Sequence, residues 1–238
     1  MNKEIEIVGS GLAGLVAAIN LAKAGCKVTV YEEKSEVGHR FHGDFQGLEN
    51  WSSEEDVTTI LERLGIYNKL YLNYICQPYN KLIVFDSNLK ETVFTSERPF
   101  FYLVQRGSRA GCLDYGLMKM AEGAGVNIVF NQRIDKAEKP AIVGIGPRAA
   151  DAIAKGIIFN TTMEDTAAAI LDDTLAPKGY SYLLIHENKA TMATCMFRDF
   201  KKEREYFEKT VATFKNVFPK LNITDATEFG CYGNFFFD

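Results

Sequence analysis

The hydrophobic pattern of the first 33 residues follows the order strand, turn, helix, strand. The apolar run at residues 5–8 predicts a short strand that ends at a glycine. Apolar residues then recur at helical spacing over residues 12–22, and Gly25 provides a helix stop. Residues 26–31 are short and β-branched, which predicts a second strand ending on an acidic pair at 32–33. The pattern therefore predicts a strand, a glycine turn, a helix, a strand and an acid.

The pattern from residue 35 to residue 145 is more mixed. Residues 35–50 are rich in glycine and are predicted to be irregular. The sequence Ser52-Ser53-Glu54-Glu55 resembles a capping box and predicts a helix that runs to about Leu64. Further on, we expect strands at 82–85, 92–95, 101–104, 127–130 and 141–145, a hairpin turn at 86–88 and a helix at about 112–122.

The second half of the chain has a different texture. Long apolar runs at 156–161, 180–186 and 191–197 predict strands, and residues 187–189 are predicted to turn between the last two. Residues 201–217 predict an amphipathic helix with Tyr206, Phe207, Val211 and Phe214 on one face. We find no internal repeat and no long linker. The expected domain boundary is therefore the point, at about residue 151, where long apolar strands begin to dominate the pattern.

Composition narrows the class of protein. The chain has 238 residues, of which 47% are hydrophobic and 24% charged, and its formal net charge of −4 does not favour nucleic acid or an anionic membrane. Five scattered cysteines without a C-x-x-C pair indicate reduced thiols and no structural disulfide or zinc site. The apolar run at 12–24 is too short and too polar to span a bilayer or to act as a signal segment. These observations predict a soluble, cytoplasmic protein.

The glycine turn has the full context of a dinucleotide-binding motif. Gly9 permits a tight turn, Gly11 lets a pyrophosphate approach the backbone, and Gly14 lets the helix pack on the sheet. Glu32, 18 residues beyond Gly14, is placed to accept hydrogen bonds from ribose hydroxyls, and Glu33 adds a charge that disfavours the 2′-phosphate of NADP. The motif alone leaves FAD and NAD open. We assign to the cofactor site Gly9, Ser10, Gly11, Ala13, Gly14, Glu32 and Glu33.

Three further segments carry a resemblance to flavoproteins. The stretch from Glu32 to Arg40 resembles the acid followed by Gly-Gly-Arg in flavoproteins of the glutathione-reductase and p-hydroxybenzoate-hydroxylase type, with His39 where a glycine is usual. Residues 101–106 and 112–117 are similar to the aromatic-x-V-x-R and L-D-x-x-L segments of geranylgeranyl-reductase-like flavoproteins, and residues 142–147 are similar to their apolar strand ending in A-x-G. The resemblance implies that Arg40, Arg106 and Gly146 contact FAD.

The resemblance also implies a substrate site and a fold. Residues 177–184 resemble the P-x-x-Y-x-W-x-F-P motif that lines the substrate cavity in those flavoproteins, which points to Pro177, Tyr180 and Tyr182. The implied α/β fold is a Rossmann-like, three-layer FAD-binding domain with a parallel central sheet (1–75 and 100–150), followed by a substrate domain (76–99 and 151–238) made of an antiparallel sheet and a helix. Substrate would lie between that sheet and the flavin ring.

The implied activity is that of an FAD-dependent oxidoreductase. Hydride would pass through flavin to or from an apolar small molecule such as an isoprenoid, with an electron donor that the sequence does not identify. The alternative is a truncated or non-catalytic protein that binds the ADP part of FAD or needs a partner, because nothing after Phe218 matches the family's closing strand, which ends in Gly-Asp, or the long helix after it. An exposed apolar surface and self-association would then be expected.

Several residues have simpler interpretations. His39, His42 and Asp44 are close in sequence, but without a third ligand pattern they are better read as solvated loop residues, and no metal is expected. Tyr180 and Tyr182 could equally be core aromatics of a strand. Without the resemblance, Arg106 would be interpreted as an exposed charge. No catalytic residue is assigned, since flavin chemistry needs no protein acid at a fixed spacing.

Overall fold

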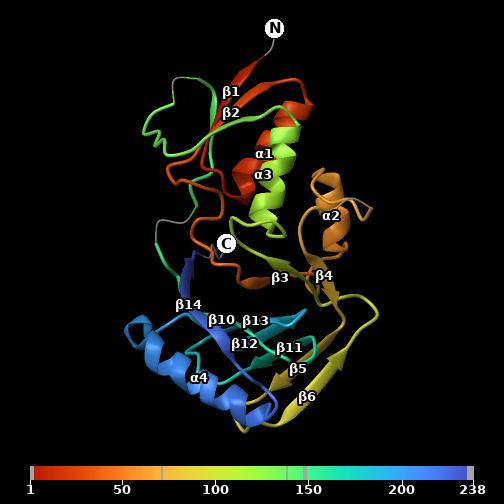
Figure 1. Ribbon diagram of the computed structural model, residues 1–238, viewed down its shortest axis with the longest axis vertical. Helices are drawn as coiled ribbons and strands as arrows, with labels where there is room; N and C mark the ends of the chain where they lie inside the picture. Colours follow the sequence, from red (N-terminus) through yellow and green to blue (C-terminus); the bar gives the residue numbers. More distant parts are fainter. Residues whose placement is uncertain (1–2, 71, 138, 147–148, 235–238) are drawn as a thin grey trace. The chain divides into compact units, whose positions relative to one another are not determined.

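The structure, a computed structural model, describes residues 3–70, 72–137, 139–146 and 149–234 (Figure 1). The chain divides into two compact units: unit 1 (Met1–Gly43, Leu48–Gln77, Val104–Gly146) and unit 2 (Asp44–Gly47, Pro78–Leu103, Pro147–Asp238). The division expected from sequence placed residues 44–47 in the first domain. They group with unit 2, where the backbone N–H of Phe45 donates to Thr191 Oγ1 at 2.7 Å.

The central sheet of unit 1 is parallel throughout. Its strand order is β8-β2-β1-β9, with β1 at Glu4–Val8, β2 at Lys27–Tyr31, β8 at Asn127–Val129 and β9 at Ala141–Val143. Helices α1 (Leu12–Lys23) and α3 (Leu113–Gly123) lie side by side and contact one another (Figure 1). Ile7, Leu15, Ile19 and Val30 are fully buried, as expected for a parallel sheet covered by helices. The predicted Rossmann-like fold is confirmed.

Helix α2 (Val57–Arg63) begins later than predicted. The capping box at residues 52–55 is wrong, because the N-cap is Asp56, whose carboxylate accepts from the backbone N–H of Thr58 at 2.9 Å. Asn50 fixes this cap, since its amide donates to Asp56 and its carbonyl oxygen accepts from the backbone N–H of Val57. A buried asparagine six residues upstream therefore decides which residue starts the helix.

Unit 2 is built on a seven-stranded sheet in the order β14-β10-β13-β12-β11-β5-β6. The strands are β5 (Lys81–Phe85), β6 (Glu91–Thr95), β10 (Ala152–Asn160), β11 (Thr166–Ile170), β12 (Tyr180–His186), β13 (Lys189–Met196) and β14 (Thr224–Gly233). The predicted antiparallel sheet is mixed, because β11 pairs with β5 in parallel. The turn at Glu187 and Asn188 has positive φ at both residues (48° and 63°), as a two-residue hairpin requires.

The amphipathic helix covers one face of this sheet. A short helix η1 (Phe200–Lys202) leads into α4 (Glu203–Val217), and Phe207 and Phe214 are buried among the strands' apolar residues. A hydroxyl pair joins the two layers, with Ser181 Oγ 2.8 Å from Thr210 Oγ1. Because side chains alternate along a strand, the neighbours of Ser181 on β12 point to the opposite face.

Three strands form a third, smaller sheet in the order β3-β7-β4. They are β3 (Phe45–Glu49), β7 (Phe101–Gln105) and β4 (Cys76–Tyr79). In each of these strands the chain crosses a boundary between unit 1 and unit 2. The expectation that residues 35–50 are irregular is therefore wrong for β3, and β4, β11 and β14 were not predicted. The stretch from Gly230 to Asp238 resembles the approach to the family's closing strand; its first residues belong to β14, and residues 235–238 lie outside the described residues.

Candidate functional site

The turn between β1 and α1, here called the glycine loop (Gly9–Gly14), depends on two of its three motif glycines for packing. Gly9 has φ +101°, and a Cβ there would lie 2.5 Å from the carbonyl oxygen of Gly144. A Cβ on Gly14 would lie 2.1 Å from the carbonyl oxygen of Gly9. Both contacts are with backbone, which has no freedom to move aside. The fold itself therefore accounts for Gly9 and Gly14.

Gly11 differs because the fold does not require it. Its φ of −69° and ψ of 174° suit any residue, and a Cβ there would have no neighbour closer than 3.9 Å. Gly11 is also the N-cap of α1, and no described side chain caps that helix end and no acidic residue lies in its first turn. The first N–H groups of α1 are thus available to an anion beside open space. This is the space that a dinucleotide diphosphate would fill.

Glu32 is held against the glycine loop by three hydrogen bonds. Ser10 donates both its backbone N–H and its hydroxyl to Glu32 Oε2, each at 2.8 Å, and the backbone N–H of Lys34 donates to Oε1 at 2.9 Å. Ser10 is buried. A carboxylate has about four acceptor positions, so this one is fixed in direction and keeps capacity for a ribose hydroxyl. The sequence assigned both residues, and the structure brings them together.

The negative charge of Glu33, which was expected to repel the 2′-phosphate of NADP, is not isolated. Its carboxylate pairs with Lys34 Nζ at 2.9 Å, and the hydrogen bond and charge of Lys34 lower its pKa. Arg133 adds a weaker attraction to the same carboxylate. The ion pair is exposed and offsets part of the repulsion toward a phosphate. Discrimination against the 2′-phosphate stays a prediction that now depends mainly on Glu32.

Arg106 is part of an internal ion pair. Its Nε and its terminal nitrogen Nη2 both donate to the Asp114 carboxylate at 2.9 Å, and the backbone N–H of Gly107 donates to the same carboxylate at 3.0 Å. The side chain of Arg106 is 13% exposed and that of Asp114 is 2% exposed. The fold thus explains Arg106 without a ligand. Asp114 was read only as part of a motif, and its spacing from Arg106 was the missed signal.

Phe41 brings the two assigned arginines to one ring. The guanidinium carbon of Arg106 lies 3.9 Å from the ring centroid and that of Arg40 lies 5.1 Å from it, both within cation–π range. Arg40 is exposed, unlike Arg106. Phe41 had no assigned role in the sequence, because a single loop aromatic carries no signal of its own.

Gly144, which the sequence did not assign, is the residue directly after β9 and meets the glycine loop. Its N–H donates to the carbonyl oxygen of Val8 at 2.7 Å, and its Cα side faces Gly14. Gly146, which the sequence did assign, has φ +74° and no described atom within 4 Å of a built Cβ. Pro147 of the same motif lies outside the described residues. The parallel register of β9 with β1 was the signal that could have identified Gly144.

The residues assigned to substrate lie at and beside β12. Tyr180 and Tyr182 share the sheet face opposite α4, with ring centroids 6.1 Å apart, and Tyr180 is 42% exposed. Cys195 and Cys231 join them, because both pair with Ala154, one from each side. We call these four residues the tyrosine face. Pro177 is buried in the turn before β12, where its carbonyl oxygen accepts from the backbone N–H of Phe197.

Burial dominates the electrostatics of the tyrosine face. It raises the pKa of Tyr182 well above its ordinary value and raises the pKa of the Cys195 thiol to about 11. Both groups are therefore neutral at physiological pH. Such a surface suits an apolar molecule and supplies neither a thiolate nucleophile nor a base.

Two kinds of feature are missing from the described part of the chain. Residues 3–70, 72–137, 139–146 and 149–234 contain no group of three or more His, Cys, Asp or Glu side chains that could hold a metal ion. Within the same ranges, every helix is too short or too polar to cross a membrane. His39, one of the histidines considered for a metal, lies on the surface 3.7 Å from Glu36.

Residues 7–47 match the family model described as "NAD(P)-binding Rossmann-like domain". A probable polyamine oxidase of Arabidopsis thaliana is 37% identical over 72 residues, which is 26% of this chain and 14% of that protein. The other curated relatives found are also covered only in part, so the chain spans about a quarter of their length or less for most of them. The family model places its match on the glycine loop and on the strands before and after it.

Comparison of structures extends the likeness to nearly the whole chain. A geranylgeranyl bacteriochlorophyll reductase-like protein of Thermoplasma acidophilum superposes with a TM-score of 0.70 at 16% identity, covering 98% of this chain and 67% of that one. The halogenase PltM, solved in complex with FAD, has a TM-score of 0.64 at 13% identity and covers 98% and 60%. The chain therefore has the fold of the FAD-dependent monooxygenases and geranylgeranyl-reductase-like proteins.

Proposed function

We propose that this chain binds FAD at the glycine loop and acts as an FAD-dependent oxidoreductase on an apolar substrate. The observation that carries the proposal is the open space beside Gly11, bordered by the uncapped N-terminus of α1 and by a carboxylate that Ser10 holds in place. Packing explains the other two motif glycines but not this one. The relatives solved with FAD support the choice of cofactor.

The chain's own residues would divide the work of binding. The first N–H groups of α1 would bind the diphosphate, and Glu32 would accept from the ribose hydroxyls of the adenosine half. Arg40, exposed beside Phe41, would supply positive charge to the diphosphate or ribityl region, while Arg106 would hold that loop in place through Asp114. When bound, FAD supplies hydride transfer, which needs no protein nucleophile.

The substrate class is proposed from the tyrosine face. Two tyrosine rings and the side chains of two cysteines offer aromatic and sulfur contacts, which favour an apolar molecule over a charged one. An isoprenoid is one such molecule, and the likeness to a geranylgeranyl-reductase-like protein supports that example. A cytoplasmic location fits the five cysteines, all of which are free thiols.

The direct test is the identity of the cofactor that the purified protein releases. We expect a flavin absorption spectrum that dithionite bleaches and air restores, and FAD by mass after denaturation. Gly11→Val should abolish flavin content, because its side chain fills the diphosphate space. Gly123→Val is the matched control, since a Cβ there meets no described atom within 4 Å and Gly123 lies outside the glycine loop. Equal flavin content in both variants would show that the site is assigned wrongly.

A second candidate is that the chain binds only the ADP half of FAD, or completes its flavin site with a partner. One observation favours it. In β9, an edge strand of a parallel sheet, Ile142 and Val143 point to opposite faces and are 41% and 66% exposed, whereas parallel sheets are normally covered on both faces. Colourless protein that binds ADP and self-associates would favour this candidate over the first.

A further inference from the structure

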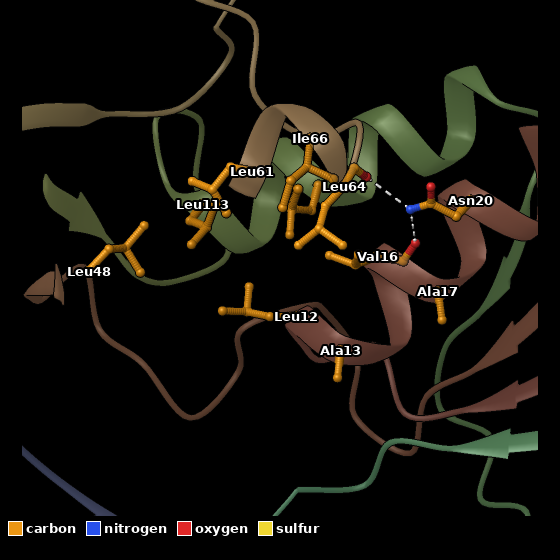
Figure 2. Close-up of a pocket in the computed structure, with 11 residues that line it drawn as sticks. Leu12, Ala13, Val16, Ala17, Asn20, Leu48, Leu61, Leu64, Ile66 and Leu113 are labelled. Carbon is orange, nitrogen blue, oxygen red and sulfur yellow. Dashed lines mark hydrogen bonds between the residues drawn. The ribbon is translucent and has the colours of Figure 1, made fainter. Parts of the chain in front are cut away.

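An apolar pocket lies in unit 1 among helices α1, α2 and α3 (Figure 2). Its volume is about 530 Å³, within the range of about 300 to 1,000 Å³ that is typical of small-molecule sites. Leucine side chains from α1, β3, the end of α2 and α3 surround the shared space, among them Leu12, Leu48, Leu61 and Leu113. Ala13, assigned from sequence to the cofactor site, lines this pocket as well.

The chemistry of the lining is aliphatic. Leucine, isoleucine, valine and alanine make up the wall, together with one amide, that of Asn20. Both amide hydrogens of Asn20 are used, because Nδ2 donates to the carbonyl oxygens of Val16 and Leu64 at 2.9 Å each (Figure 2). The side chains of the lining therefore include no charged group, no aromatic ring and no uncommitted N–H donor.

The walls of the pocket are held in place without a ligand. The Asn20 amide joins α1 to the end of α2, and Lys23 Nζ donates to the carbonyl oxygen of the next residue, Gly65, at 3.0 Å. Asp56 and Asn50 fix the other end of α2. A pocket that is already formed loses little conformational entropy when it binds a molecule. It also leaves apolar surface in water, with Leu64 40% exposed at its edge.

We propose that this pocket binds the aliphatic chain of a neutral, lipid-like molecule whose polar end remains in water. A polar atom among these side chains would lose its hydrogen bonds to water and find no uncommitted side-chain donor to replace them. A flexible hydrocarbon chain loses nothing of this kind and gains from each methylene group it buries. The proposal does not rest on FAD binding, because neither the motif glycines nor Glu32 line the pocket.

The experiment is a displacement titration with linear alcohols. The fluorescent probe cis-parinaric acid is bound first and excited by energy transfer from Trp51, the single tryptophan of the chain. Octan-1-ol, decan-1-ol and dodecan-1-ol should displace it with affinity that rises about tenfold for each two added methylene groups. Dodecane-1,12-diol should bind about tenfold or more weakly than dodecan-1-ol, because one hydroxyl must enter the pocket or the chain must fold back. Equal affinity for alcohol and diol would overturn the proposal.

Two variants locate the binding. Val16→Phe places a ring in the pocket and should weaken dodecan-1-ol by about tenfold, while Val93→Phe, at an exposed position on β6, should leave it unchanged. Leu61→Ala enlarges the pocket and should shift the preference toward tetradecan-1-ol. Circular dichroism establishes that each variant is folded. Unchanged affinity and chain preference in folded Val16→Phe and Leu61→Ala would overturn the proposal, as would a wild-type dimer that Val16→Phe converts to a monomer in sedimentation.

Discussion

The motif glycines of unit 1 and the two tyrosines of the tyrosine face of unit 2 were both assigned from sequence, yet the structure accounts for them in different ways. In the glycine loop, packing explains Gly9 and Gly14 while nothing in the fold explains Gly11. On the tyrosine face, each ring sits where an ordinary strand residue would sit, with Tyr180 exposed and Tyr182 half-buried beside the neutral thiol of Cys195. Only the first region contains a motif residue whose identity packing leaves unexplained.

In a structure without a bound molecule, a residue indicates a ligand only where the fold does not already account for it. A residue that the fold already requires says little about ligands, however well it matches a motif. Arg106 illustrates this, because the Asp114 carboxylate and the Phe41 ring account for its position. Gly11 and the directed carboxylate of Glu32 carry more weight. The variants below test whether Arg106 is held by the fold alone, and whether Gly11 and Glu32 matter mainly for binding a ligand.

We expect the largest effect on stability from loss of the ion pair between Arg106 and Asp114, which accounts for the position of Arg106 without a ligand. Asp114→Ala leaves a guanidinium with 13% exposure and without its two carboxylate bonds, which costs about 3 kcal/mol in the free energy of unfolding. Urea denaturation measures the loss. Asp135→Ala is the control, because Asp135 forms an exposed pair with Arg133 whose loss costs well below about 1 kcal/mol. If both variants lost the same amount of stability, the ion pair with Asp114 would not explain why Arg106 is at this position.

The two glycines of the loop provide the sharpest contrast. Gly14→Ala forces a Cβ to 2.1 Å from a backbone oxygen and should lower the free energy of unfolding by about 2 kcal/mol or more. Gly11→Ala meets no such contact and, as an N-cap change, should lower the free energy of unfolding by about 1 kcal/mol or less. Urea denaturation gives the stability, and titration with ADP gives the binding. If Gly11→Ala were the less stable variant, the claim that the fold does not need Gly11 would be wrong.

The buried Cys195 thiol of the tyrosine face should make the free energy of unfolding depend on pH. Burial raises the pKa of Cys195 from 9.0 to about 11, so the folded state retains a proton that the unfolded state has lost. This contribution is complete below pH 9 and disappears as the pH rises from about 9 to 11. The free energy of unfolding should therefore fall over this window, by up to about 2 kcal/mol from this thiol. Cys195→Ala should make the fall smaller, as measured by urea denaturation at pH 8, 9.5 and 10.5; an identical fall would contradict the burial of this thiol.

The sequence was sufficient for elements with strong local signals. The strand, helix and strand of the glycine-loop unit follow from apolar periodicity and two punctuating glycines, and they lie within a residue or two of the prediction. It was insufficient where long-range contacts decide. Strand β11 is largely alanine, which carries no strand preference, and it forms because β12 and β5 pair with it on both sides.

The candidate site shows the same limit. Ser10 and Glu32 could be assigned from spacing because a single motif contains both. Gly144 and Asp114 were missed, because the signals for them, a strand register and a spacing from Arg106, gain meaning only once the pairing of β9 with β1 and the contact between a loop and a helix are known. The N-cap of α2 was also missed, since Asn50 acts on it from outside the local pattern. Residues that act through a partner far along the chain need the structure.

The smallest expected effect is at Ser10, which belongs both to the fold and to the ligand site. Ser10→Ala removes the hydroxyl bond to Glu32 Oε2 and keeps the backbone bond, so the free energy of unfolding should fall by about 1 kcal/mol. ADP affinity should fall by less than about tenfold, because the carboxylate remains near the ribose position but is less firmly directed. Ser35→Ala, at an exposed position, should change neither quantity. Stability loss without any change in ADP affinity would mean that Ser10 and Glu32 form only a structural contact, and the assignment of the ribose acceptor would then have to move away from Glu32.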